Sequence, residues 1–123
     1  MKENILAAYS TSKSYPELVQ KLMEIGIRSY TVDTATGTIL YRMDNGEHVL
    51  HHGEAQRNIT PSFSESGTVA AIRNNQQGKS TYPQFMDAIA EAGIYFYEAT
   101  LNGENKRVTY IGKDGAYEER IPI

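Results

Sequence analysis

The chain has 123 residues, of which 40% are hydrophobic, and its 12 basic and 15 acidic residues give a net charge of -3. This length suits one compact domain, and a slightly acidic chain without a run of Lys or Arg is not expected to bind nucleic acid. The absence of cysteine excludes disulfides, thiolate metal ligands and cysteine nucleophiles, and it fits a reducing compartment. Residues 1–8 lack the features of a signal peptide, and no window approaches the ~20 apolar residues of a membrane span. We therefore expect a cytoplasmic protein that makes no membrane contact.

A weak helical pattern opens the chain at residues 3–9, and a similar one recurs at residues 65–77, where Gly78 would end it. Each of these segments precedes a stronger helix, so we expect two helices in each half of the chain. The loop-like stretch at residues 53–63 separates the halves.

The stronger helices belong to a segment that occurs twice. Residues 15–30 return as residues 82–97, a shift of 67 positions, and six of the 16 aligned positions are identical. Roughly one identity is expected by chance. Internal similarity of this kind indicates a duplicated structural unit. We predict one domain over residues 1–123, with copy one at about 2–52 and copy two at about 64–122.

The repeated segment carries the same helix signals in both copies. Ser14 and Thr81 are capping residues, and each is followed three positions later by Glu or Gln, as in a capping box. Proline stands in the first turn, where it is tolerated. Apolar residues at helical spacing then predict one buried face. Gly26 and Gly93 are expected to end the two helices.

Strands follow each of these helices. The expected strands are residues 27–32, residues 38–43 and a third after Asp44-Asn45-Gly46 in copy one, and residues 94–99, residues 107–111 and a third after Lys113-Asp114-Gly115 in copy two. Asn-Gly and Asp-Gly are strong hairpin signals. The predicted fold class is therefore α+β, an internal duplication of a helix–helix–three-stranded antiparallel meander unit whose two copies share one core.

The sequence contains no convincing catalytic or cofactor-binding motif. Residues 78–81 (Gly-Lys-Ser-Thr) look like the end of a phosphate-binding loop, but Arg73 stands where that motif needs glycine, and a helix rather than a strand precedes it. We interpret this segment as a helix stop followed by a helix cap. Glu24 and Glu91 occupy equivalent positions beside the apolar stripe, and we interpret them as solvent-exposed rather than as paired catalytic carboxylates. We predict no catalytic residue and no cofactor, and we lean towards a protein that is not an enzyme.

The three histidines, His48, His51 and His52, are close together in the sequence. On a strand, His48 and His52 would share one face about 13 Å apart, which is too far for one metal ion, while His51 would point the other way. A metal site would also need Glu47 or Glu54. We therefore predict no metal site and interpret the group as a polar strand end.

The aromatic composition is unusual, with nine tyrosines, three phenylalanines and no tryptophan. Tyr95 and Tyr97 alternate with two other large apolar residues, so strict alternation would give both faces of that strand large side chains. Two interpretations remain open: a fully buried central strand, or an aromatic binding or dimer surface. The candidate interaction surface consists of Tyr30, Tyr95, Tyr97 and Tyr110.

Part of copy two carries a resemblance to known proteins. The residues concerned are residues 78–82, Phe85, Ala90, residues 92–94 and residues 105–107. With them the chain resembles a family of small uncharacterised bacterial proteins, grouped as YdfO-like, which are carried partly by enteric prophages and are often labelled phage envelope protein. The resemblance implies a compact α+β domain and supplies no catalytic residues. The absence of export or membrane signals gives the envelope label no support.

Two classes of function remain open from the sequence. The first is a non-enzymatic cytosolic protein-interaction or regulatory module of prophage origin, which acts through sheet edges or the aromatic surface on a protein partner or on a second copy in a homodimer. The second is a small-ligand-binding protein or simple enzyme with a site in the groove between the two copies. A concave polar groove would favour the second class, and a flat apolar patch would favour the first.

Overall fold

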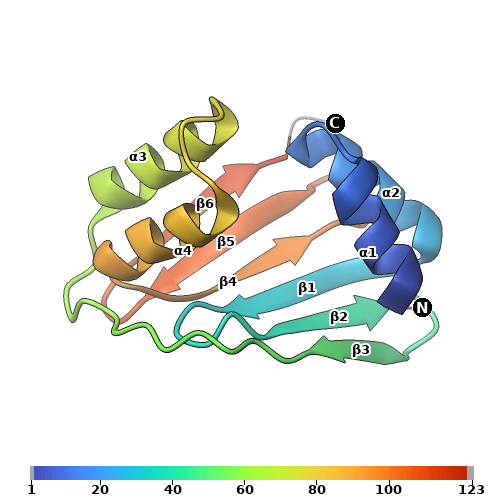
Figure 1. The fold of residues 1–123 in the computed structure, drawn as a ribbon, viewed down its shortest axis with the longest axis horizontal. Coiled ribbons are helices and arrows are strands. Elements are labelled where there is room, and N and C mark those ends of the chain that lie inside the picture. The colour runs from blue at the N-terminus through green and yellow to red at the C-terminus, as the bar shows by residue number, and fades with distance from the viewer. Residues whose placement is uncertain (1, 122–123) are drawn as a thin grey trace.

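The structure is a computed structural model that describes residues 2–121. Two helix pairs lie on one face of a single six-stranded antiparallel sheet (Figure 1). The helices are α1 (Lys2–Thr11), α2 (Tyr15–Ile25), α3 (Glu65–Gln76) and α4 (Tyr82–Glu91). The strands are β1 (Ile27–Asp33), β2 (Ile39–Met43), β3 (His48–His51), β4 (Ile94–Thr100), β5 (Arg107–Gly112) and β6 (Ala116–Arg120). The predicted α+β class and the duplicated helix–helix–three-strand unit are confirmed.

The two meanders join through their first strands. The strand order is β3-β2-β1-β4-β5-β6, so β1 and β4 are central and β3 and β6 form the edges. In the central pair Thr31 lies opposite Glu98, its own counterpart at the shift of 67, and the Thr31 hydroxyl donates to the Glu98 carboxylate at 3.2 Å. This register places a pseudo-two-fold axis at the pair, so the sheet of each copy continues directly into the sheet of the other.

A β-bulge occurs at the same place in both copies. The register shifts between Ile27 and Ser29 in β1 and between Ile94 and Phe96 in β4. A bulge inserts one extra residue and interrupts the alternation of side chains. In β4, Ile94 and Tyr97 are therefore both buried, whereas Phe96 and the residue before it are exposed. The expectation of strict alternation along this strand is wrong for that reason.

The caps of α2 and α4 differ in detail. Thr81 and Gln84 form the complete capping box, with bonds in both directions. The Ser14 hydroxyl accepts the backbone N–H of Glu17 at 3.3 Å, but the Glu17 carboxylate accepts the N–H of Lys13 at 2.6 Å instead of returning to the cap residue. The predicted capping box is thus complete in copy two and incomplete in copy one.

The glycines that end α2 and α4 both have positive φ, as predicted, but their surroundings differ. At Gly26 (φ 104°) an added Cβ would lie 3.6 Å from the methyl carbon of Met43, which is ordinary contact. At Gly93 (φ 85°) it would lie 2.4 Å from the backbone oxygen of Ser62. The segment that links the copies therefore packs directly against Gly93, where glycine satisfies both the backbone conformation and the close approach.

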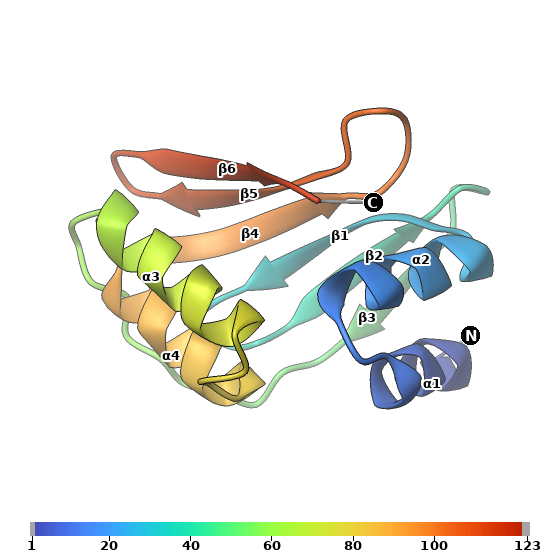
Figure 2. The same cartoon turned by 90° about the horizontal axis from the view of Figure 1, so that it is seen from above.

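The hydrophobic core lies between the sheet and the four helices. Leu22 in α2 and its counterpart Ile89 in α4 are both 0% exposed, and they belong to one cluster that contains residues of both copies. Figure 2 shows the two helix pairs side by side over the sheet, with the first turns of α2 and α4 facing each other across its middle. None of the helices within residues 2–121 is long and apolar enough to cross a membrane.

Candidate functional site

Four tyrosines lie on the four inner strands of the sheet, β2, β1, β4 and β5, on the side covered by the helices. Tyr30 and Tyr41 lie in copy one and Tyr97 and Tyr110 in copy two, and each is at most 6% exposed. Their rings pack in pairs, with centroids 5.7 Å apart for Tyr30–Tyr41 and 5.2 Å apart for Tyr97–Tyr110. Of the predicted interaction surface, Tyr30, Tyr97 and Tyr110 therefore lie in one buried group.

Each copy connects the start of its second helix to its first strand by a bond between two tyrosine hydroxyls. The oxygens of Tyr15 and Tyr30 are 2.6 Å apart, and those of Tyr82 and Tyr97 are 3.2 Å apart. The two bonds are related by the same shift of 67 positions. In each bond the hydroxyl on the strand obtains the partner that a buried polar group needs.

A third hydroxyl pair is present only in copy one. The Tyr41 hydroxyl donates to the Tyr9 hydroxyl at 3.0 Å, whereas Tyr110, the counterpart of Tyr41, has no such bond within residues 2–121. Tyr9 is 38% exposed and Tyr82 is 48% exposed, so the group reaches solvent through these two residues. We call the whole set the tyrosine cluster; it consists of Tyr9, Tyr15, Tyr30, Tyr41, Tyr82, Tyr97 and Tyr110.

The phenols of the two copies influence one another. Burial and the neighbouring Tyr41 raise the pKa of Tyr9, and Tyr82 of the other copy adds to the increase. Burial also raises the pKa of Tyr15 to about 12, although its bond to Tyr30 acts in the opposite direction. Burial is the largest cause of a raised pKa for the remaining members, Tyr30, Tyr41, Tyr82, Tyr97 and Tyr110. All seven phenols are therefore protonated at neutral pH.

Protonated phenols can act on a ligand in two ways. Each hydroxyl pair uses one O–H proton for its internal bond and leaves the other proton for a further acceptor. The aromatic rings offer apolar faces and edges beside these donors. Tyr15 and Tyr82 begin α2 and α4, and the first turns of these helices face each other across the middle of the sheet (Figure 2).

Tyr95, the fourth residue of the predicted interaction surface, lies apart from the cluster. It is 38% exposed, as is the adjacent Phe96, because the bulge in β4 turns both residues away from the core. The predicted surface therefore divides into a buried part and an exposed part, and its role as an interaction surface stays a prediction.

The three histidines are exposed. β3 ends at His51, so His52 lies beyond it, and the expectation that His48 and His52 share a strand face is wrong. In the part of the chain that the structure describes, no group of three or more His, Cys, Asp or Glu residues is arranged to hold a metal ion. The absence of a metal site stays a prediction that a binding experiment has to test.

The other motifs have structural roles or lie at the surface. Gly78 has a φ of 73° and follows α3, the N–H of Lys79 donates to the carbonyl of Asn74 at 2.8 Å, and Thr81 caps α4. This is the predicted helix stop followed by a helix cap. Both carboxylates that the sequence places beside the apolar stripes, at positions 24 and 91, are exposed.

The hydroxyl bonds of the tyrosine cluster were not predicted from the sequence, although a signal for them was present. Tyr15 matches Tyr82 and Tyr30 matches Tyr97, and these are two of the six identities between the copies. Two tyrosines 15 positions apart, retained in both copies, indicate a contact that each unit repeats.

Comparison with known proteins identifies a family but no activity. The family described as "Protein of unknown function (DUF1398)" matches residues 3–117. Uncharacterised proteins of Mycobacterium bovis and Mycobacterium tuberculosis are 31% identical to the chain over 111 residues, which covers 85% of this chain. The chain spans 65% of the length of these relatives.

Proposed function

Because the chain belongs to the DUF1398 family, whose description states no activity, we propose a function from its geometry: it binds a small organic molecule at the tyrosine cluster, between the two copies. The observation that carries this proposal is the hydroxyl bond of Tyr15 with Tyr30 and its repetition by Tyr82 with Tyr97. Sites between related halves of a protein are frequent ligand positions.

Packing alone does not account for hydroxyls at these positions. A phenylalanine would fill the space of Tyr30 or Tyr97 without placing a polar group in the core, where such a group is unfavourable unless it is bonded. The chain instead has a bonded phenol in both copies, and its outer partner lies closer to the surface. A role in ligand contact explains why the polar arrangement occurs twice.

The chemistry of the cluster favours a neutral ligand with a ring and an oxygen acceptor. The raised pKa values of Tyr15 and Tyr82 keep both phenols as O–H donors. A carbonyl or ether oxygen can accept these protons while the aromatic rings contact the apolar part of the molecule. Acetophenone is a suitable probe, and ethylbenzene is the matched control that lacks the acceptor.

The test is a titration of the full chain with each probe, followed by NMR of labelled tyrosine rings. We expect acetophenone to give saturable shifts at Tyr9, Tyr15 and Tyr82 and to bind more tightly than ethylbenzene. The double variant Tyr15→Phe/Tyr82→Phe should weaken acetophenone binding about 30-fold, because two hydrogen bonds of about 1 kcal/mol each are lost. Tyr95→Phe is the control and should bind like the parent chain. No saturable shift with acetophenone, or equal binding by the double variant, would refute the proposal.

A second candidate function is protein interaction, including formation of a homodimer. It is favoured by the exposure of Tyr95 and Phe96 and by the free outer edges of β3 and β6, which can pair with another chain. Light scattering after gel filtration at about 100 µM, well above a dissociation constant near 1 µM, tests self-association. Tyr95→Ser/Phe96→Ser should abolish it. The mass of a single chain for the parent protein at that concentration would rule out the homodimer.

A cytoplasmic location and a prophage origin belong to the same proposal. The lack of cysteine supports a reducing compartment, and the resemblance of residues 78–82 and their neighbours to the YdfO-like proteins supports the origin. Fractionation of cells that express the chain tests the location, and recovery in the membrane or exported fraction would contradict it.

A further inference from the structure

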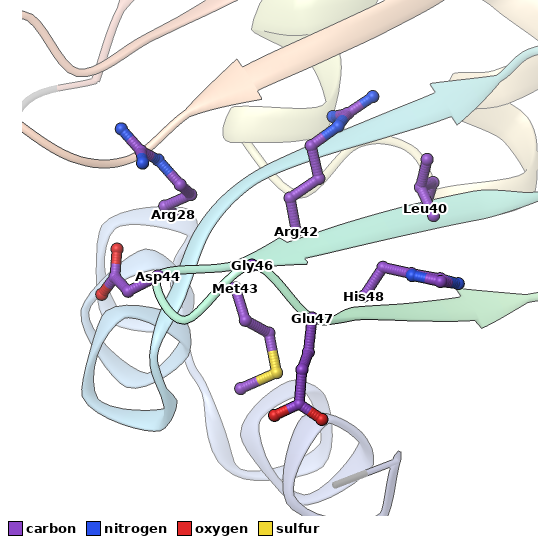
Figure 3. Close-up of a pocket in the computed structure, with 8 residues that line it drawn as sticks. All are labelled: Arg28, Leu40, Arg42, Met43, Asp44, Gly46, Glu47 and His48. Atoms are coloured by element: carbon purple, nitrogen blue, oxygen red, sulfur yellow. The ribbon is translucent and has the colours of Figure 1, made fainter.

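An open depression of about 460 Å³ lies on copy one, where β1 and β2 meet the turn into β3. Its lining includes Arg28, Arg42 and His48 together with the apolar side chain of Leu40. Figure 3 shows that Arg28 and Arg42 extend to the same side of the strands, away from Met43. The lining thus includes two guanidinium groups on one side of the sheet, together with the apolar side chain of Leu40.

Arg42 is held in a fixed position by the strands beside it. One of its terminal nitrogens, Nη1, donates to the Thr31 hydroxyl at 2.8 Å and to the Ser29 hydroxyl at 3.5 Å, and it lies 3.8 Å from the Glu98 carboxylate. Within residues 2–121 these contacts all use Nη1. The edge formed by Nε and Nη2, which can bind an oxyanion through two parallel hydrogen bonds, keeps its donors.

Arg28 provides the second cation. It is exposed, and its side chain has no hydrogen bond or ion pair with any part of the chain between residues 2 and 121. The charge of Arg28 therefore forms no ion pair that would stabilise the described part of the fold. It lines the same depression as the oriented guanidinium group of Arg42, which fits recognition of an anion instead.

Copy two has no counterpart of this pair. Tyr95 occupies the position that corresponds to Arg28, and Ile111 the position that corresponds to Arg42. The same backbone therefore forms without either arginine. The cationic pair is a property of copy one and not a requirement of the repeated unit.

Two carboxylates also line the depression, one on the side opposite the arginines and one near Arg28. The Glu47 carboxylate accepts a hydrogen bond from the side-chain amide of Asn45 at 2.6 Å, and in Figure 3 it extends to the side opposite Arg28. Asp44 lies just after β2, and in Figure 3 its carboxylate is near Arg28. An anion can therefore approach the two arginines from the face of the sheet that no helix covers (Figure 2).

We propose that this depression binds the oxyanion group of a small organic ligand, a phosphate ester or a carboxylate. Arg28 and Arg42 hold the anion, His48 contributes a ring nitrogen at the margin, and Leu40 contacts the apolar part of the ligand. This site lies on the open face of the sheet and is separate from the tyrosine cluster, which lies under the helices.

The experiment uses three probes that share one ring: phenyl phosphate, benzoate and the neutral control phenol. Each is titrated into the full chain at physiological ionic strength, where loose electrostatic contacts are screened, and binding is followed by backbone amide shifts. We expect at least one of the two anions to give saturable shifts at Arg28, Arg42 and His48, and phenol to give none there. A stronger effect of phenyl phosphate assigns the site to phosphate esters, and a stronger effect of benzoate assigns it to carboxylates.

Two variants with the same change in charge make the test specific. Arg28→Gln should weaken binding of the preferred anion about tenfold, as expected for the loss of one charge-assisted contact. Arg120→Gln, on exposed β6 of copy two, should leave binding unchanged. Amide spectra away from the site should match the parent chain and show that both variants are folded. The proposal is overturned if neither anion saturates, if phenol shifts the same residues, or if the two variants weaken binding equally.

Discussion

The two copies agree in their buried positions and differ on their exposed faces. Leu22 and Ile89 are both fully buried at matching positions, and the hydroxyl bond between tyrosines is present in each copy. On the open face of the sheet, by contrast, Arg28 of copy one, whose side chain has no ion pair within residues 2–121, corresponds to Tyr95 of copy two. The two copies therefore share their buried core positions and the tyrosine hydroxyl bonds near the pseudo-two-fold axis. Their exposed residues on the open face of the sheet differ. Any function shared by both copies is expected at the axis, and any function of one copy alone is expected on the open face.

Raising the pH should have the largest effect, since it acts on the tyrosine cluster of both copies at once. Burial raises the pKa of Tyr30 and Tyr97 well above the usual value near 10, so the folded chain holds these phenol protons more strongly than the unfolded chain does. Stability is therefore complete below about pH 10 and is lost as the pH rises further. Circular dichroism and phenolate absorbance should change together in an alkaline titration. Ionisation of the whole cluster in a chain that stays folded would contradict the buried, coupled arrangement.

The second largest effect on stability is expected from shortening matching core side chains in the two copies. Leu22→Ala and Ile89→Ala should each lower the free energy of unfolding by about 2–5 kcal/mol, because each leaves a cavity at a fully buried position. Since both residues belong to one core cluster, urea unfolding of either variant should show a single transition. Two transitions, of which each variant shifts only one, would mean that the copies fold independently.

The glycines that end α2 and α4 should distinguish the copies. Gly26→Ala should cost about 1–2 kcal/mol, the usual penalty for a left-handed conformation without other hindrance. Gly93→Ala should cost about 1–3 kcal/mol more, because the new methyl group also meets the backbone of Ser62. Urea midpoints of the two variants measure the difference. Equal losses of unfolding free energy in the two variants would contradict the close approach of the Ser62 backbone to Gly93.

The smallest difference in stability between the copies is expected from removing the helix caps of α2 and α4. Thr81→Ala and Ser14→Ala should each cost about 1 kcal/mol, the typical value for a lost helix cap. The loss of stability should be larger by a few tenths of a kcal/mol, to order of magnitude, at Thr81. There the Gln84 side chain also accepts the backbone N–H of the cap residue, whereas the Glu17 carboxylate does not bond to Ser14. Thermal unfolding of the two variants in parallel provides the comparison. A larger loss at Ser14 would mean that the complete capping box adds no stability.

Local signals in the sequence predicted most of the secondary structure. The hydroxyl caps, the glycine stops and the Asn-Gly turn each act through neighbouring residues, so they could be recognised without knowledge of the rest of the chain. Duplication then fixed the order of the elements in the second half from that in the first. The strand boundaries differ from the prediction by one residue at the start of β2 and at the ends of β1, β4 and β5.

Contacts between distant segments could not be predicted in the same way. The pairing of β1 with β4 decides which strands are central, and no residue next to Thr31 in the sequence encodes its position opposite Glu98. The bulge that separates Tyr95 from Tyr97 depends on the register with β5. For the same reason, tyrosines could be named as candidates from the sequence, but not which of them are in contact. Arg28 and Arg42 were not identified as a pair, because they come from different strands.

The central pairing of β1 with β4 also has a consequence for the rate of folding. Each meander closes short loops, and its helices lie close to it in the chain, so either half can assemble from local contacts. The strand pair at the axis instead joins positions 63 to 71 residues apart, and contacts of such long range carry a higher entropic barrier. We therefore expect the joining of two partly formed halves, rather than the formation of either half, to limit how fast this chain reaches its native state.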